Sequence, residues 1–498
     1  MNFSIPKEVK QVSHTLKTAG FEAYLVGGCV RDLCVGRTPR DWDLTTNARP
    51  EEIQALFLHS FYENSFGTVG VVNDETEDIT LKVIEVTPYR IESIYSDFRR
   101  PDAVTFSDKL EDDLKRRDFT INALALDLQE NDKPTRKGHI IDLYNGLKDI
   151  EAKVIRTVGH PGERFTEDAL RMLRAIRIGT ELSFMISHET SEAIMLHLKL
   201  LENISKERIR DEFIKIIMSD NPMQGVILCE KLGVLTYIAP ELLDSIGIEQ
   251  NKKAHKYTVW EHLLRSLQHA ADKKWSLEVR LAALFHDISK PETRRFTRNN
   301  GEDTCSFYGH EVLGARKTRK ILERLRFPVK LINKVERLIR WHMFFADTEQ
   351  ITLSAVRRLI HNVGPENVWD LMNLRACDRI GTGRPKESPY RLRKYHAMIE
   401  EAMMDPISVG LLKIDGKRIM EVTHETPGKR IGYILHALLE EAIEDSTKNN
   451  TEYLEKRAIE LSKLDEKELE ELGKKGKELK EEEEQKQIEE IRGKHGVK

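Results

Sequence analysis

The sequence predicts an α+β chain in which an N-terminal mixed α/β head precedes an all-helical remainder. Up to about residue 150, short strand-like runs alternate with segments of helical spacing, which is typical of mixed α/β domains. From Thr166 onward the apolar spacing becomes strongly helical. The 498 residues exceed a single typical core, so we expect several domains.

Composition excludes several classes of protein. No run of about 18 apolar residues exists, so no membrane span is expected. The N-terminal residues lack the pattern of a secretion signal, and five scattered cysteines indicate neither a metal site nor a disulfide framework. We therefore expect a cytoplasmic protein. The net charge of −4 says little about nucleic-acid binding, because acidic residues concentrate in the last thirty or so positions.

The first motif is LVGGCVRD at residues 25–32, followed by RDWDL at residues 40–44. A strand leads into Gly27 and Gly28, where the backbone can turn tightly, and a short helix follows whose free amide groups suit a phosphate. A second strand is predicted to carry Asp41 and Asp43 on one face, because side chains alternate along a strand. Two carboxylates beside a phosphate cradle suit Mg²⁺ and either phosphoryl or nucleotidyl transfer.

Together, GG-x-x-RD and RDWD resemble the signature of the class II tRNA nucleotidyltransferase and poly(A) polymerase family. The resemblance implies that Asp41 and Asp43 are catalytic Mg²⁺ ligands and that Gly28 and Arg31 bind the nucleotide. Residues 66–72 and 81–87 are predicted to form two more strands of the head. Glu85 lies on the second of these. It could face the metal as a third carboxylate or face solvent, and we leave it outside the predicted site.

The string EDDLKRRDFTINA at residues 111–123 closely matches the next motif of this family. Arg117 can offer a planar, permanently charged fork to a triphosphate oxygen. Asp118 and Asn122 are expected to brace the site. Residues 142–149 resemble a family turn that couples the head to a helical neck.

The string TEDALRMLRAIR at residues 166–177 is predicted to form a helix that chooses the base. Cytosine and adenine both present an amine donor beside a ring-nitrogen acceptor. A carboxylate at Asp168 and a guanidinium at Arg171 complement that pair and disfavour guanine and uracil. The family resemblance gives this motif the same role, with Arg174 and Arg177 reaching the triphosphate. The helix at residues 204–216 resembles a supporting family motif, and we assign it structure only.

A second set of residues resembles the HD metal-dependent phosphohydrolase superfamily. The resemblance implies four core metal ligands, which are His262, His286, Asp287 and Asp378. His310 and His342 fall where two-metal members add ligands, and Lys290 could contact phosphate. Imidazole and carboxylate ligands suit a divalent transition metal. Whether this site is hydrolytic stays open.

These motifs define five predicted regions: a nucleotidyltransferase head at 1–150, a helical neck at 151–250, an HD domain at 251–385, a helical tRNA-contacting region at 386–455 and a charged tail at 456–498. In the fourth region, Lys429 and Arg430 could add positive charge toward an RNA phosphate.

We predict template-independent addition of CCA, from CTP and ATP, to tRNA 3′ ends, with Mg²⁺ as cofactor. The alternatives are CC addition, A addition, poly(A) synthesis, or an HD phosphohydrolase as the main activity. The oligomeric state and the role of the tail stay open.

Overall fold

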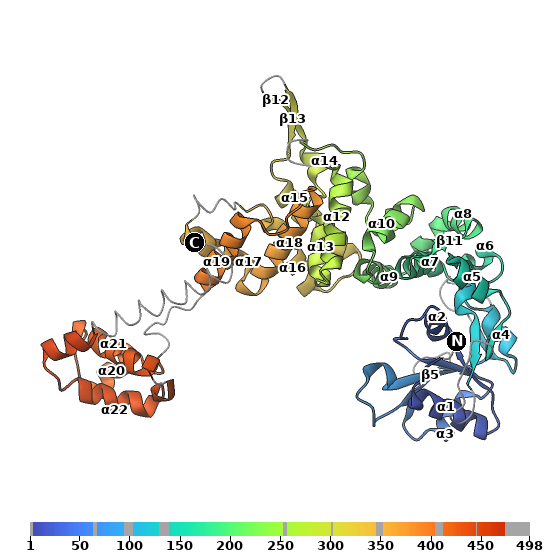
Figure 1. Ribbon diagram of the computed structural model, residues 1–498, viewed down its shortest axis with the longest axis horizontal. Helices are drawn as coiled ribbons and strands as arrows, with labels where there is room; N and C mark the ends of the chain where they lie inside the picture. Colours follow the sequence, from blue (N-terminus) through green and yellow to red (C-terminus); the bar gives the residue numbers. More distant parts are fainter. Residues whose placement is uncertain are drawn as a thin grey trace. The chain divides into compact units, whose positions relative to one another are not determined.

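A computed structural model describes residues 3–62, 67–93, 103–128, 139–251, 256–299, 302–344, 352–403, 412–444 and 446–473. The chain divides into two compact units, Met1–His342 with Cys377–Arg384, and Met343–Ala376 with Pro385–Lys498. The first unit joins a mixed α/β head to helices, and the second is helical, which confirms the α+β prediction (Figure 1). Within the described residues, no helix is long and apolar enough to cross a membrane.

The head is built on a seven-stranded sheet in the order β3-β4-β5-β2-β1-β8-β9. Strands β2 and β5 are parallel, and the other neighbours are antiparallel. The strands are β1 (Ala23–Val26), β2 (Asp43–Thr46), β3 (Ser60–Tyr62), β4 (Val69–Val72), β5 (Val83–Pro88), β8 (Leu124–Asp127) and β9 (Ile140–Asp142). Strands β6 (Arg90–Ser93) and β7 (Ala103–Phe106) form a separate antiparallel pair. The predicted strand at 66–72 is shorter than expected, and Phe66 lies outside the described residues.

The head helices are α1 (Lys7–Thr18), α2 (Gly28–Cys34), α3 (Pro50–Leu56), α4 (Leu110–Lys115) and α5 (Gly146–Ala152). Apolar residues at helical spacing on α1, including Leu16, pack with Leu25, Leu44 and Ile53 in one core cluster. Leu110 and Leu114 of α4 belong to a second, smaller cluster with Val26. Alternate residues of β1 thus pack into two different cores, because successive side chains of a strand point to opposite faces.

The neck comprises α6 (Pro161–Glu167), α7 (Leu170–Leu182), α8 (His188–His197), α9 (Lys206–Met218), α10 (Pro222–Lys231) and α11 (Leu235–Ile238), with a parallel pair β10 (Val154–Ile155) and β11 (Met185–Ile186). The single helix predicted over 166–177 is wrong. The chain leaves α6 at Asp168, whose backbone is extended (φ −141°), and its carboxylate accepts a hydrogen bond from the Leu170 amide at the start of α7. An aspartate that caps a helix costs less than one inside it, which explains the break.

The histidine-rich part of the first unit is formed by α12 (Val259–Asp272), α13 (Leu277–Phe285), α14 (Lys290–Thr293), the hairpin β12 (Arg295–Asn299) and β13 (Glu302–Ser306), α15 (His310–Arg324) and α16 (Val329–Trp341). Short 3₁₀ segments are η1 (Ile79–Leu81), η2 (Thr120–Asn122), η4 (Leu198–Asn203), η5 (Pro240–Ser245), η6 (Pro365–Asn367) and η8 (Ser446–Lys448). Helix α18 (Val368–Gly381) begins in the second unit and ends in the first, where it carries Asp378.

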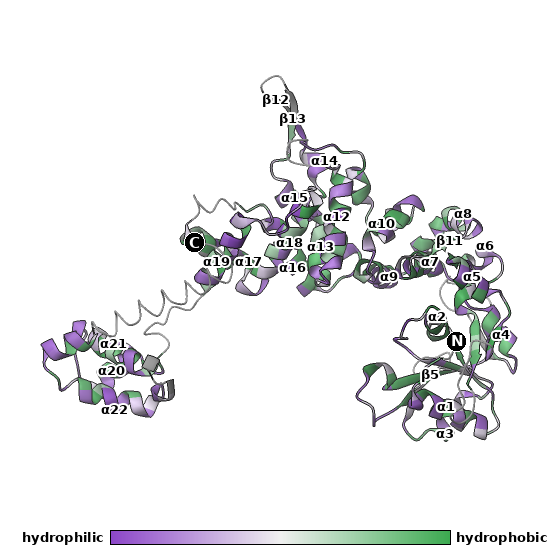
Figure 2. Ribbon diagram, viewed as in Figure 1, coloured by the Kyte–Doolittle hydropathy of each residue, from purple (hydrophilic) through white to green (hydrophobic). Residues whose placement is uncertain are grey.

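The second unit contains α17 (Leu353–Val363), α19 (Tyr390–Met403), α20 (Gly416–Thr423), α21 (Lys429–Glu444) and α22 (Thr451–Leu461). Helices α20, α21 and α22 enclose an apolar core that includes Ile419, Leu438 and Leu454. Figure 2 shows that hydrophobic and hydrophilic residues both occur along these helices. Leu461 and Leu469 are also buried in that core. The boundary predicted after residue 455 therefore falls inside α22, and the folded region extends past it. Residues 474–498 of the predicted charged tail lie outside the described residues.

One glycine of the head makes a close backbone contact that can be tested. A Cβ at Gly146 would lie 2.2 Å from the Thr120 carbonyl oxygen. We expect Gly146→Ala to destabilise the head by about 1–3 kcal/mol, since the backbone at Thr120 must move. Hydrogen exchange of head peptides should then accelerate roughly tenfold or more. Gly432→Ala is the control, because a Cβ there meets nothing within 4 Å. Unchanged exchange in the Gly146 variant would contradict this packing.

Candidate functional sites

The first candidate site lies at the start of β2. Asp43 is the first residue of that strand, and it pairs in register with Glu85 of the parallel strand β5. Asp41 precedes the strand and is exposed, so the prediction that both aspartates lie on the strand is wrong for Asp41. Residues paired directly across two strands direct their side chains to the same face. Glu85 is thereby brought beside Asp43, a neighbour that sequence reasoning left open because it could not fix the strand register.

A glycine turn adjoins these carboxylates. Gly27 caps α2 with φ of +78°, and a Cβ there would lie 2.9 Å from Arg117 Nη1 and 3.7 Å from Asp43 Oδ2. Gly28, which is predicted to bind the nucleotide, is the first helical residue, and a Cβ there would make only an ordinary contact with Arg31. The conformational demand therefore falls on Gly27. Its missing side chain leaves room for the Arg117 guanidinium beside Asp43.

A chain of polar side chains links the three predicted nucleotide-binding motifs. Arg31 donates to Asp32 through Nε and Nη2 (2.9 and 2.7 Å), and to Asn122 Oδ1 through Nη1 (2.9 Å). Asn122 Nδ2 donates to Asp118 Oδ1 at 3.0 Å. Asp118 Oδ2 accepts from Nε and Nη2 of Arg174 at 2.8 and 2.6 Å. The network thus runs from α2 through the 111–123 motif to α7.

Asp118 is the buried centre of this network. Burial by itself opposes ionisation, but the Arg174 guanidinium and the Asn122 amide outweigh it and hold the pKa of Asp118 well below its ordinary value. Asp118 Oδ1, which accepts from Asn122, also accepts a hydrogen bond from the Phe119 amide at 2.8 Å. Arg174 is therefore paired with Asp118, whereas the family resemblance implies that it reaches the triphosphate.

Arg117 is held by a second buried carboxylate. Its Nη2 donates to Asp113 Oδ2 at 2.9 Å, and Arg116 donates to the other oxygen of Asp113. Burial opposes ionisation of Asp113, but the two guanidinium groups outweigh it and lower its pKa. A fixed carboxylate behind Arg117 keeps its guanidinium next to Gly27.

The predicted base-reading residues have separate partners. Asp168 Oδ2 forms an ion pair with Arg208 of α9 at 2.9 Å. Arg171 donates to Glu167 Oε2 at 2.6 Å and to the Arg116 carbonyl oxygen at 3.0 Å. Arg208 therefore belongs to this site, although its helix had been assigned structure only. A pairing between distant helices leaves no signal in spacing along the chain.

Arg177 has a different partner. It forms an ion pair with the buried Glu212 of α9, with Nε and Oε2 2.9 Å apart. As with Arg174, its guanidinium is engaged within the neck.

The second candidate site is a buried cluster of histidines and carboxylates. Within the described residues, two groups of three side chains could each hold a metal ion. In each group the potential ligand atoms lie within 4.8 Å of one another. One group is His262, His286 and Asp378, and the other is His286, Asp287 and His342. His262 Nε2 lies 2.9 Å from His286 Nε2 and 3.0 Å from Asp287 Oδ2. The four predicted HD residues are brought together, with His310 Nε2 also 3.2 Å from Asp287 Oδ1.

Hydrogen bonds orient three of these imidazoles. His286, His310 and His342 each have Nδ1 within 2.6–3.0 Å of a backbone carbonyl, at Ala283, Phe307 and Ile339. Each ring thus directs Nε2 toward the cluster as a potential ligand. The Nε2 atoms of His310 and His342 are buried and form no hydrogen bond in the described part of the chain. Unsatisfied buried ring nitrogens facing carboxylates fit a divalent metal.

The charges of the cluster also fit a cation. Burial alone would lower the pKa of His286, but the carboxylates of Asp287 and Asp378 outweigh it and raise that pKa to about 9. Lys290 donates to Asp287 Oδ2 and to Gln250 Oε1, both at 2.6 Å. Lys290, which is predicted to contact phosphate, is thus already held against the cluster.

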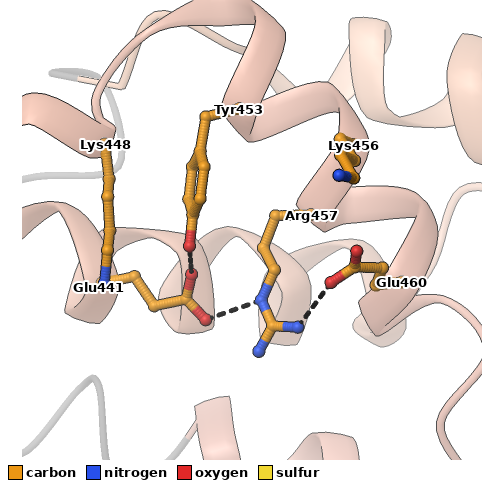
Figure 3. A pocket seen from close by; sticks show the side chains of 6 residues that line it. All are labelled: Glu441, Lys448, Tyr453, Lys456, Arg457 and Glu460. Carbon is orange, nitrogen blue, oxygen red and sulfur yellow. Dashed lines mark hydrogen bonds and ion pairs between the residues drawn. The ribbon is translucent and has the colours of Figure 1, made fainter.

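A surface pocket of about 400 Å³ lies between α21 and α22 of the second unit. Figure 3 shows Glu441 accepting from both Tyr453 and Arg457, while Arg457 also binds Glu460. Lys448 and Lys456 complete the lining.

Elsewhere in this unit, Arg430 donates to Glu425 and to the Ser462 and Leu464 carbonyls, so it ties α21 to the segment after α22.

Three parts of the chain match known families. Residues 23–156 match the poly A polymerase head domain, and residues 183–246 match a probable RNA- and SrmB-binding site of polymerase A. Residues 259–371 match the HD domain. A CCA-adding enzyme of Enterococcus faecalis is 33% identical over 458 residues, which cover 91% of this chain and 96% of that protein. The chain belongs to the CCA-adding enzyme family.

Other members of the family agree with this assignment. A CCA-adding enzyme of Lactobacillus helveticus is 49% identical over 281 residues, covering 56% of this chain and 64% of the relative. The structure of the Bacillus stearothermophilus CCA-adding enzyme in complex with CTP is 26% identical and superposes with a TM-score of 0.59, covering 92% of this chain and 98% of that one. The family assigned from the motifs is thus confirmed.

The Asp118 network predicts a specific pH dependence. The pKa of Asp118 is lower in the folded protein than in an unfolded chain, so its stabilising contribution is complete above about pH 4 and is lost as pH falls below that value. Asp118→Asn should remove this dependence. At neutral pH it should also cost about 3–5 kcal/mol, because Arg174 loses its charged partner.

Urea unfolding between pH 3 and 7 measures both effects, and buried Trp42 reports on the head. Asp211→Asn serves as the control, because its carboxylate is largely exposed. An identical pH slope in wild type and Asp118→Asn would contradict the role of this ion pair.

Proposed function

We propose that this chain adds CCA to tRNA 3′ ends, from CTP and ATP and without a nucleic-acid template. The observation that carries the proposal is the cluster formed by Asp43, Glu85, Gly27 and Arg117, next to the exposed Asp41. Membership of the CCA-adding enzyme family supports it, as does the similar structure that holds CTP.

Oxygen donors at the start of β2 fit a hard divalent cation, and we propose that Asp41 and Asp43 hold Mg²⁺. When bound, such an ion acts as a Lewis acid on the triphosphate and lowers the pKa of the attacking RNA 3′-hydroxyl. Arg117, fixed by Asp113, binds a triphosphate oxygen, and Gly27 lets the backbone approach the phosphates. Arg31 supports this site by donating a hydrogen bond to Asn122. Pyrophosphate leaves when the new phosphodiester forms.

Base selection is assigned to Asp168 and Arg171. An ionised carboxylate has about four acceptor sites, so Asp168 can accept the amine of cytosine or adenine while bound to Arg208. A guanidinium has five N–H donors, which leaves Arg171 able to donate to a ring nitrogen while bound to Glu167 and the Arg116 carbonyl. Arg208 and Glu167 are thus positioning residues, whereas Arg174 and Arg177 act through Asp118 and Glu212. CC addition, A addition and poly(A) synthesis use the same chemistry and remain alternative outcomes of the assay below.

A second activity is favoured by the buried histidine cluster. We propose that His262, His286, Asp287 and Asp378, with His310 and His342, hold a divalent transition metal. A metal there would supply a hydroxide at neutral pH for attack on a phosphate ester. Lys290 would neutralise charge on the substrate phosphate from its place beside Asp287.

The two activities should separate by mutation. We expect Asp41→Asn to lower nucleotide incorporation at least a hundredfold without affecting phosphate-ester hydrolysis, and His286→Ala to do the reverse, because each removes a metal ligand from one site. Purified protein is incubated with tRNA transcripts that lack CCA, lack only the final A, or are complete, with each NTP singly. The product ladder distinguishes the alternatives. Glu77→Gln, an exposed carboxylate of the head, is the control. Undiminished incorporation by Asp41→Asn would reject the assigned site.

Base choice provides a separate test. Asp168→Asn exchanges one acceptor oxygen for a donor amide, which suits a base carbonyl. We expect the preference for CTP over UTP to fall about ten- to a hundredfold, measured as the ratio of kcat/KM values. Glu163→Gln, an exposed change on the neighbouring helix α6, should leave that ratio unchanged. A preserved ratio in Asp168→Asn would show that another group reads the base.

A further inference from the structure

The strand pairing of the head places an aromatic ring in line with the carboxylates of the first site. Phe61 of β3 pairs with Gly70 of β4, and Gly70 pairs with Glu85 of β5. Glu85 in turn pairs with Asp43 at the start of β2. Residues paired directly across neighbouring strands direct their side chains to the same face of a sheet. Phe61 therefore lies on the face that carries Asp43 and Glu85.

A glycine lets this ring lie across the neighbouring strand. A Cβ at Gly70 would lie 2.7 Å from Phe61 Cζ and 3.0 Å from its Cε1. The same position is 3.1 Å from Val83 Cγ1 on β5, so the tip of the ring leans from β3 over β4 toward β5. Phe61 is nevertheless 43% exposed. One side of the ring is thus supported by the sheet, and the rest is open to a ligand.

The separation between the ring and the carboxylates suits one nucleotide. Neighbouring strands lie about 4.8 Å apart, so β4, over which the ring lies, is roughly 10 Å from β2. A nucleoside spans a comparable distance from its 3′-oxygen to the far edge of its base. The last nucleotide of an RNA can therefore place its 3′-hydroxyl at the carboxylates and its base on Phe61.

A phenyl ring suits a position at which the base changes from step to step. During stepwise addition of CCA, each new nucleotide becomes the end of the acceptor, so the terminal base differs between steps. Hydrogen-bonding groups would favour one base, whereas every base has a π-face that stacks on an aromatic ring. The incoming nucleotide instead requires selection, which is assigned above to Asp168 and Arg171.

We propose that Phe61 is the stacking platform for the last base of the RNA acceptor, and that Gly70 makes room for its ring. The ligand is the 3′ end of an RNA strand, whichever base it carries. This inference rests on the nucleotidyl transfer proposed above. It adds the residue that positions the attacking nucleotide.

Steady-state kinetics with varied tRNA and saturating NTP tests the platform, using transcripts that lack CCA or only its final A. Phe61→Ala should raise KM for each transcript about tenfold and leave KM for CTP and ATP unchanged, because only the acceptor base loses its stacking partner. Phe61→Tyr should keep the low KM, whereas Phe61→Leu, which is apolar but has no π-face, should not. An unchanged KM for tRNA in Phe61→Ala, or an equal rise for CTP, would overturn the proposal.

The next residue of the strand provides a matched control. Tyr62 is 47% exposed, but it pairs with Val69 of the apolar core, so its side chain is directed to the opposite face of the sheet. Tyr62→Ala should therefore leave KM for tRNA unchanged. A tenfold rise in this variant would show that exposed rings of β3 act regardless of face, which contradicts the platform.

Gly70→Ala tests the geometry independently. The added Cβ would displace the ring, because it would lie 2.7 Å from Phe61 Cζ. We expect the same rise in KM for tRNA as in Phe61→Ala, and no further rise in the double variant, because both changes remove one contact. A larger rise in the double variant would show that Gly70 acts through another group and would reject the proposed geometry.

A binding measurement separates the platform from the activity. A tRNA transcript whose last nucleotide is 4-thiouridine is photocrosslinked to the protein, and the labelled peptide is identified by mass spectrometry. Labelling of the peptide that contains Phe61, without nucleotide incorporation, would retain the platform and reject nucleotidyl transfer. Incorporation without labelling there would reject the platform alone. A change of the mass in solution by Phe61→Ala, measured by light scattering, would assign the ring to an interface between copies of this chain and overturn the proposal.

Discussion

A buried carboxylate shared between the head and the neck is the constraint on which the first site depends. Asp118 accepts two hydrogen bonds from Arg174 of α7 and two from its own motif. Asn122, one of the donors in that motif, also accepts a hydrogen bond from Arg31 on α2. Removing either charge would leave the other without its charged partner, which is strongly destabilising. The ion pair therefore fixes the position of α7 relative to the head. The glycine turn at the start of α2 is thereby linked by one hydrogen-bonded network to α7, which lies next to the proposed base-reading residues.

The histidine cluster follows the same logic with a different outcome. Asp287 is also buried and ionised, but it faces Lys290 together with several imidazoles whose outer nitrogens are fixed by backbone carbonyls. In the nucleotidyltransfer site, guanidinium groups neutralise the buried acids permanently. In the cluster, the carboxylates face one lysine and imidazoles that can release their protons, so a divalent metal ion can replace the His286 proton. One unit of the protein thus contains a set of carboxylate oxygens and a mixed set of imidazoles and carboxylates, for which we propose different divalent cations.

Local patterns in the sequence predicted much of this architecture, and long-range contacts account for what they missed. The head, the helical remainder and the gathering of His262, His286, Asp287 and Asp378 followed from motifs. The break at Asp168 was missed because helical periodicity carries no information about a capping carboxylate. Glu85 and Arg208 depend on strand register and on packing between α7 and α9, neither of which is encoded in spacing along the chain. Arg174 and Arg430 were interpreted as ligand contacts, and the structure adds protein partners that spacing could not predict, which are Asp118 for Arg174 and the Ser462 carbonyl for Arg430.

One contact described above bears on how such a site can change through evolution. Arg171 is held in part by the carbonyl oxygen of Arg116, which every amino acid supplies equally. The side chain at position 116 can therefore vary without disturbing that anchor, whereas a shift in backbone conformation there would move the guanidinium that we propose meets the base. Fidelity at this point is protected from substitution but exposed to insertion or deletion in the α4–β8 connection.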